Sequence, residues 1–109
     1  MTPKDRLRRL EKITLLLRER ELSRLAQASA QKTRTEAQLM ALDKTGAPHG
    51  LDPVVAAQVT DRFGLWTTNR RILLNQKLAR ETVAWMEAKT EAQRAFGRAE
   101  VLRKLCLKP

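Results

Sequence analysis

The side chains that most often carry chemistry are few and far apart in this chain. Its one histidine, His49, lies in a stretch rich in Gly and Pro, and its one cysteine, Cys106, lies near the C-terminus. Local spacing therefore offers neither a His/Cys metal site nor a Cys/His nucleophilic pair. We expect His49 to be a solvated loop residue. Since a single cysteine cannot form an internal disulfide, we expect Cys106 at a helix–helix interface of a cytoplasmic protein.

The acidic residues also lack the pattern of an active site. Asp and Glu alternate with Lys and Arg, as in Arg18-Glu19-Arg20-Glu21, which is typical of solvated ion pairs on helix surfaces. The chain contains no glycine-rich phosphate-binding loop and no dinucleotide-binding fingerprint. It has no apolar run of about 18 residues and no N-terminal signal pattern, which argues against a membrane span or secretion. We therefore expect a non-enzyme with no cofactor and no metal.

Net charge is the remaining chemical signal. The chain has 22 Lys and Arg against 12 Asp and Glu, a formal charge of +10. The surplus is uneven, because the region 4–43 carries +4, the region 44–64 is neutral and the region 65–109 carries +6. Such a surplus attracts an acidic protein surface, nucleic acid or an anionic membrane, and charge alone does not choose among them.

The elements that must position these charges are two long helices. Gly46, Pro48, Gly50 and Pro53 fall in the single stretch TGAPHGLDP, which predicts one connector. Thr2 as cap and Pro3 as first helical residue begin a predicted helix over 4–43, about 60 Å long. Its apolar stripe consists of the leucines at 7, 10, 17, 22, 25, 39 and 42, with Ile13. Between residues 25 and 39 the stripe weakens, so we expect looser packing there.

The second helix carries a heptad repeat. Positions 74, 78, 81, 85, 88, 92, 95, 99, 102 and 106 alternate steps of four and three, and only Glu81 among them is out of character. A repeat of 3.5 residues is the signal of a coiled coil. Asp52 and Pro53 predict an earlier helix start, and Gly64 predicts a break. We therefore expect a short connecting helix over 53–63 and a long helix over 65–107.

Together these patterns predict an all-α fold, an antiparallel two-helix coiled-coil hairpin with a short connecting helix, as a single domain over 1–109. Leu17 is expected to face Ala92, and Leu10 to face Ala99, so that large side chains cover small ones. Both chain termini then share one end of the hairpin. That end is strongly basic, with three acidic residues, Asp5, Glu11 and Glu100, against Arg6, Arg8, Arg9, Lys12, Arg98, Arg103, Lys104 and Lys108.

Two groups of residues are candidates for binding a partner. The first is basic and the second aromatic, and an aromatic side chain outside the helix interface marks an interaction surface. The candidates are Arg6, Arg8, Arg9, Arg98, Arg103 and Lys104, with Phe63 and Trp66. Three alternatives stay open: the charges only keep the protein soluble, the chain binds nucleic acid, or it self-associates through Phe63, Trp66 and Met86. Few aromatics and no known motif argue against nucleic acid, and no free apolar face is evident for direct membrane binding.

The second helix, LWTTNRRILLNQKLARETVAWMEAKTEAQRAFGRAEVLRKL, resembles the C-terminal helix of the FliJ/YscO family, the small stalk proteins of flagellar and type III secretion export. The resemblance covers both long helices and is strongest from Asn69 to Leu105. The chain is shorter than typical members. The resemblance implies a cytoplasmic stalk at the inner face of the membrane whose partners are a hexameric export ATPase, the export gate and free chaperones. The basic end is then the part expected to meet the ATPase ring.

Overall fold

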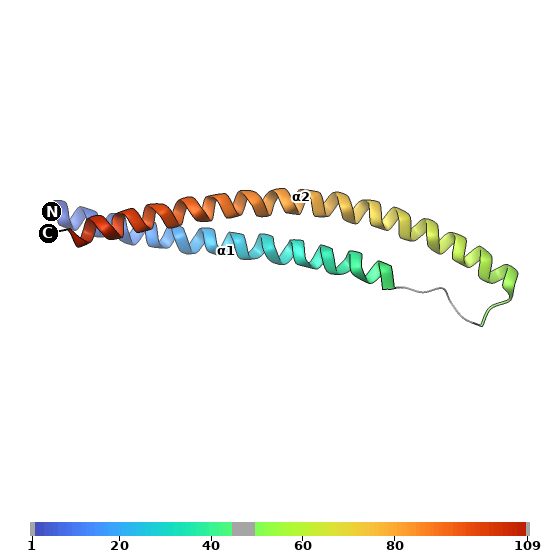
Figure 1. Ribbon diagram of the computed structural model, residues 1–109. Helices are drawn as coiled ribbons and strands as arrows, with labels where there is room; N and C mark the ends of the chain where they lie inside the picture. The colour runs from blue at the N-terminus through green and yellow to red at the C-terminus, as the bar shows by residue number, and fades with distance from the viewer. Residues whose placement is uncertain (1, 45–49, 109) are drawn as a thin grey trace. The chain divides into compact units, whose positions relative to one another are not determined.

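Two long α-helices make up the fold. The structure is a computed structural model that describes residues 2–44 and 50–108, and within those ranges it contains no strand. Helix α1 spans Pro3–Lys44 and helix α2 spans Pro53–Leu107 (Figure 1). The predicted all-α class is confirmed. His49 and the glycine and proline at 46 and 48 lie outside the described residues.

The helix ends follow from local sequence, as predicted. At the start of α1 the backbone N–H of Asp5 donates to the hydroxyl of Thr2 at 3.2 Å, and the backbone N–H of Thr2 donates back to the Asp5 carboxylate at 3.2 Å. This reciprocal pair is a capping box, which satisfies N–H groups that have no partner in the first turn. Helix α2 begins at Pro53, and the N–H of Ala56 donates to the carbonyl of Asp52 at 2.7 Å.

The predicted break at Gly64 is absent, and this prediction was wrong. Helix α2 runs without interruption through Gly64, so no separate connecting helix over 53–63 forms. A glycine in a helix interior costs about 1 kcal/mol relative to alanine, which weakens a long helix without ending it. Val59, Phe63 and Thr67 are half-buried at steps of four, so one face of the helix continues past the glycine.

Contacts divide the chain into two compact units, and each contains part of both helices. We call Met1–Ala30 with Val83–Pro109 the terminal unit, and Gln31–Thr82 the middle unit. In the terminal unit Leu7 lines one depression with Cys106, and Leu25 lines another with Trp85. Later residues of α1 thus meet earlier residues of α2, so the two helices are antiparallel in this unit.

The middle unit shows the same antiparallel order. The hydroxyl of Thr35 donates to the carboxylate of Glu81, and Arg71 donates to Asp43 at 2.6 Å. The predicted pairing of Leu17 with Ala92 would place Asp43 opposite a residue near 66. Asp43 instead lies beside Arg71, so the predicted pairing was wrong in this unit. Because α1 ends at Lys44, the part of α2 before Arg70 has no α1 residue opposite it within the described residues.

The heptad repeat predicted for α2 is confirmed by burial. Four of its ten positions are buried, namely Leu74, Ala92, Ala95 and Ala99, and the other six, including Glu81, are half-buried. Small side chains at these core positions let the two helix axes approach closely.

The stripe predicted for α1 was wrong in its first half. Leu10, Ile13 and Leu17 are 47, 51 and 37% exposed, and Leu22 is exposed as well. Most of the less exposed residues of α1 instead follow a heptad repeat. They are Leu7, Glu11, Thr14, Arg18, Glu21, Leu25, Ala28, Lys32, Thr35, Leu39 and Leu42, and the two others, Leu15 and Glu36, each follow one of these positions. The expected contacts of Leu10 and Leu17 with the alanine stripe are thus replaced by those of polar residues.

The reason lies in the phase of the repeat. Leu7, Leu25, Leu39 and Leu42 are all in phase with one another on a 3.5-residue repeat, whereas Leu10 and Leu17 are one residue out of phase with it. A helix can present only one stripe to its partner helix. The four leucines that share one repeat therefore determine which stripe of α1 faces α2. In the terminal unit, polar side chains of α1 therefore occupy core positions: the Nε atom of Arg18 is buried, and the Glu21 side chain is 14% exposed.

Candidate protein-binding surface

The six basic candidates all lie in the terminal unit and are all exposed. Arg103 is paired with Glu100 at 2.5 Å, one turn earlier in the same helix. Within residues 2–44 and 50–108, the other five, Arg6, Arg8, Arg9, Arg98 and Lys104, form no ion pair. Their charges are therefore available to a binding partner.

The excess of positive charge is concentrated in the terminal unit. That unit contains 14 Lys and Arg against 7 Asp and Glu, a formal charge of +7, and the middle unit contains 8 against 5, or +3. Three of the seven acidic residues, Glu21, Glu91 and Glu100, are already paired with an arginine three residues away. The field around the terminal unit is thus positive.

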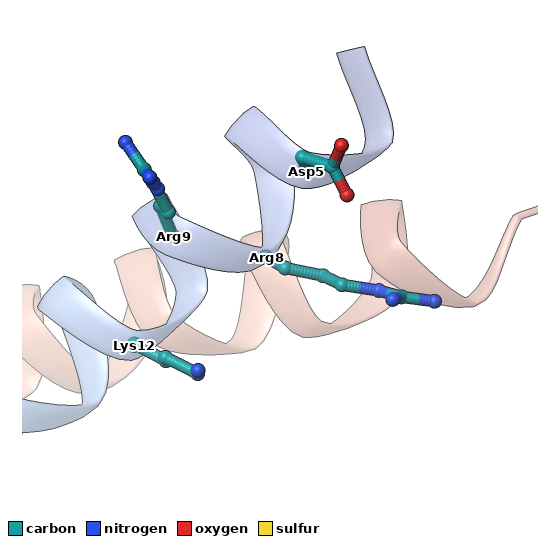
Figure 2. Close-up of a pocket in the computed structure, with 4 residues that line it drawn as sticks. All are labelled: Asp5, Arg8, Arg9 and Lys12. Atoms are coloured by element: carbon teal, nitrogen blue, oxygen red, sulfur yellow. The ribbon is translucent and has the colours of Figure 1, made fainter. Parts of the chain in front are cut away.

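The first turns of α1 show how these charges are arranged. Figure 2 shows Asp5, Arg8, Arg9 and Lys12 around a shallow hollow, with the guanidinium groups of Arg8 and Arg9 pointing in different directions. Hydrogen bonds from the Thr2 backbone and hydroxyl hold the pKa of Asp5 below its ordinary value. The basic side chains diverge, so they form a broad charged surface and not a closed pocket for one small anion.

Two further pKa shifts occur on α2. The hydrogen bond from Arg103 lowers the pKa of Glu100, and Glu100 in turn raises the pKa of Arg103. A hydrogen bond to Glu11 raises the pKa of the Cys106 thiol, and partial burial adds to it. Cys106 therefore lies half-buried at a core position between α1 and α2, as the sequence predicted, and the direction of its pKa shift is opposite to that of an activated thiol.

The two aromatic candidates belong to the middle unit. The rings of Phe63 and Trp66 stack with their centroids 5.8 Å apart and an interplanar angle of 29°, and Trp66 is 54% exposed. They lie on the part of α2 that has no α1 residue opposite it. The structure thus assigns the eight predicted residues to two separate surfaces, six to one unit and two to the other.

Sequence reasoning missed two contacts between a basic side chain and an aromatic ring. The guanidinium of Arg18 lies 5.6 Å from the centroid of the Phe96 ring, and the ammonium of Lys89 lies 5.3 Å from that of Trp85. Both geometries permit cation–π attraction. Arg18 occupies a core position of α1, so extending the heptad from Leu7 to Leu25 would have found it.

Other classes of site receive little support. Over the described ranges, no group of three or more His, Cys, Asp and Glu is placed to hold a metal ion. The same residues contain no helix with the length and apolar character needed to span a membrane. Comparisons with protein families, curated proteins and solved structures find no match to this chain.

Proposed function

We propose that this protein is a non-enzymatic helical adaptor that binds an acidic protein through its basic terminal unit. The observation that carries the proposal is the set of five exposed basic side chains, Arg6, Arg8, Arg9, Arg98 and Lys104, with no carboxylate partner among the residues described. Positive charge that is not neutralised within the molecule steers and holds a partner of opposite charge.

The resemblance to the FliJ/YscO family suggests the particular partner. On that basis we propose a stalk or adaptor of a flagellar or type III export apparatus, with the basic end directed to a hexameric export ATPase. Two antiparallel helices with both chain ends in one unit suit this role, because basic residues from α1 and α2 are brought to the same end. The export gate and chaperones are the other partners that the resemblance suggests.

A charge-reversal experiment tests the proposal. The triple variant Arg8→Glu, Arg9→Glu and Arg103→Glu changes three exposed residues of the terminal unit. We expect it to lose copurification with the export ATPase in a tagged pull-down from cells, with bound proteins identified by mass spectrometry. Circular dichroism should show unchanged helix content, because the replaced side chains are exposed.

The matched control places the same charge change elsewhere. The variant Arg34→Glu, Lys77→Glu and Arg80→Glu alters three exposed basic residues of the middle unit, none of them in an ion pair of the described structure. It should retain the partner. If both variants lose it equally, net charge and not the terminal unit governs binding. If neither does, the basic surface is not the binding site.

A further inference from the structure

The terminal unit has an apolar surface beside its helix interface. On α1 the surface consists of Leu10, Ile13 and Leu17, which are spaced at i, i+3 and i+7 and exposed. On α2 it includes Val101 and Leu105, which are also exposed. We call these five residues the lateral strip.

Heptad positions place both halves of the lateral strip on one face. All five residues precede a core position by one residue, so they share one side of the repeat. On α1 these core positions are Glu11, Thr14 and Arg18, and on α2 they are Leu102 and Cys106. Two antiparallel helices are related by a two-fold axis perpendicular to their length, and rotation about this axis exchanges the helices but maps each face of the pair onto itself. Equivalent heptad positions of α1 and α2 therefore share a face.

A hollow on the same side of α2 adds shape to this surface. Its volume is about 540 Å³, and it is lined by Thr14, Arg94, Gly97, Arg98, Val101 and Leu102. Nothing lies within 4 Å of the position where Gly97 would carry a Cβ, so the hollow is open above the glycine. The hydroxyl of Thr14 donates to the Glu11 carbonyl at 2.8 Å, which leaves its methyl group free to contact an apolar ligand.

The charges around the lateral strip select the kind of occupant. Arg94 and Arg98 border the hollow, and Arg98 forms no ion pair in the part of the chain that the structure describes. A second copy of this chain would bring another unit of charge +7 against this one, which is electrostatically unfavourable. A bilayer surface would not fill a hollow of this kind, and the strip has no aromatic side chain of the sort that anchors helices in membranes.

We infer that the lateral strip binds one amphipathic helix of acidic character, contributed by the partner protein. Apolar side chains of that helix at i, i+3 and i+7 pack against Leu10, Ile13 and Leu17, and one of them enters the hollow above Gly97. Its carboxylates meet Arg94 and Arg98. The partner helix thus becomes the third helix of a bundle, a recognised mode of peptide binding. The inference rests on the proposed function, because it specifies the partner of the same terminal unit.

A peptide titration tests this inference directly. The probe is a synthetic helix of about 14 residues, ~21 Å long, with Leu at i, i+3, i+4 and i+7 and mostly Glu elsewhere. A second peptide of the same composition has a scrambled order, so that it keeps the charge but has no apolar face. We expect the full chain to bind the amphipathic peptide about tenfold or more tightly than the scrambled one by fluorescence anisotropy.

Two variants of the protein probe the strip and the hollow separately. Leu10→Gln, Ile13→Gln and Leu17→Gln removes the apolar half on α1, and Gly97→Leu fills the hollow. Each should weaken binding of the amphipathic peptide about tenfold and leave the scrambled peptide unaffected. The controls are Met40→Gln, Ile72→Gln and Leu73→Gln, which replace three exposed apolar residues of the middle unit, and Gly64→Leu. Circular dichroism checks that every variant is folded.

The outcomes separate the inference from the proposed function. Equal binding of both peptides, unchanged in the strip variants, would overturn the helix site and leave binding by charge intact. Loss of partner copurification in the Arg8, Arg9 and Arg103 variant tests the function independently of either peptide. Binding to anionic vesicles that the strip variant abolishes, or a change of oligomeric state by sedimentation in that variant, would assign the strip to a membrane or to a second copy and would overturn the inference.

Discussion

The terminal and middle units use the same two helices but fill the interface between them differently. In the terminal unit the buried residues are Ala92, Ala95 and Ala99, and α1 supplies mainly polar side chains opposite them. In the middle unit the buried residues are Leu74 and Thr35, and Thr35 is bonded to Glu81. The terminal unit is characterised by small buried side chains, and the middle unit by a large buried aliphatic side chain and a part-buried hydrogen bond between polar side chains.

This difference shows how one heptad repeat can serve two purposes. Alanine needs no large partner, so α1 can carry Glu11, Arg18 and Glu21 at core positions and still pack closely. Leucines and arginines of the terminal unit are then left outside, where they can bind a partner. The part-buried pair of Thr35 and Glu81 adds little net stability but disfavours every helix register that separates the two groups.

The largest effect is expected from Leu74 of the middle unit. Leu74→Ala should lower the free energy of unfolding by about 2–4 kcal/mol, because it removes a buried side chain and leaves a cavity. Leu74 is 3% exposed and its neighbour Leu73 is 58% exposed. Leu73→Ala is therefore the control and should cost less than about 1 kcal/mol in urea denaturation. Equal losses would mean that α1 does not cover Leu74.

In the terminal unit the opposite substitution should destabilise. Ala99 is 2% exposed, so Ala99→Leu forces the helices apart and should cost about 1–3 kcal/mol in the same assay. Ala84→Leu introduces the same side chain at an exposed position of the same unit and should be close to neutral. A stable Ala99→Leu variant would contradict close packing over the alanine stripe.

Removal of the buried hydroxyl should have a similar or somewhat smaller effect. Thr35→Ala leaves the Glu81 carboxylate without its partner on α1 and should cost about 1–3 kcal/mol. The control is Thr33→Ala, an exposed threonine two positions earlier. The double variant Thr35→Val with Glu81→Leu should recover most of the loss, since an apolar pair can replace a buried polar one. Failure of that recovery would indicate that other groups hold this layer together.

A smaller gain is expected at Gly64. Because α2 is continuous at Gly64, Gly64→Ala should raise the free energy of unfolding by about 0.5–1 kcal/mol, since alanine is the better helix former and nothing lies within 4 Å of the new methyl group. Thermal unfolding followed by circular dichroism measures the change. A loss of stability would contradict a helical conformation at this position.

The smallest effect concerns pH at the first turn of α1. The pKa of Asp5 is lowered below its ordinary 3.8 in the folded chain, so its capping interaction stabilises the helix above that value and is lost as the pH falls through the folded pKa. The protection factors of the amides of residues 4–8, which are their exchange rates corrected for the intrinsic effect of pH, should therefore fall in acid. Asp5→Asn should remove the pH dependence of these protection factors, and persistence of that dependence would assign it to another group.

Much of the fold could be predicted from particular residues. Thr2 with Pro3, and Asp52 with Pro53, mark both helix starts, because capping and the fixed proline φ are local properties. The heptad repeat of α2 was predicted correctly through all ten positions, since its partner must lie along one face. The same local reasoning failed at Gly64, because the free-energy cost of a single glycine is too small to end a long helix.

The candidate surface was predicted only in part. The basic residues were found because charge is counted without knowing contacts, but the lateral strip was not, because Leu10, Ile13 and Leu17 look the same in sequence as leucines that face a partner helix. Two apolar stripes of α1 overlap in the sequence. The buried stripe is the one that contains Leu7, Leu25, Leu39 and Leu42, which share one heptad repeat and face the core positions of α2.

By itself, the sequence determined the helical state, the helix starts, the repeat of α2 and the excess of positive charge, since each follows from neighbouring residues or from composition. Only the tertiary structure decided which stripe of α1 is covered, that Asp43 lies beside Arg71, and that Thr35 meets Glu81. These features depend on fitting two helices together at once, because burial of one stripe excludes burial of the other.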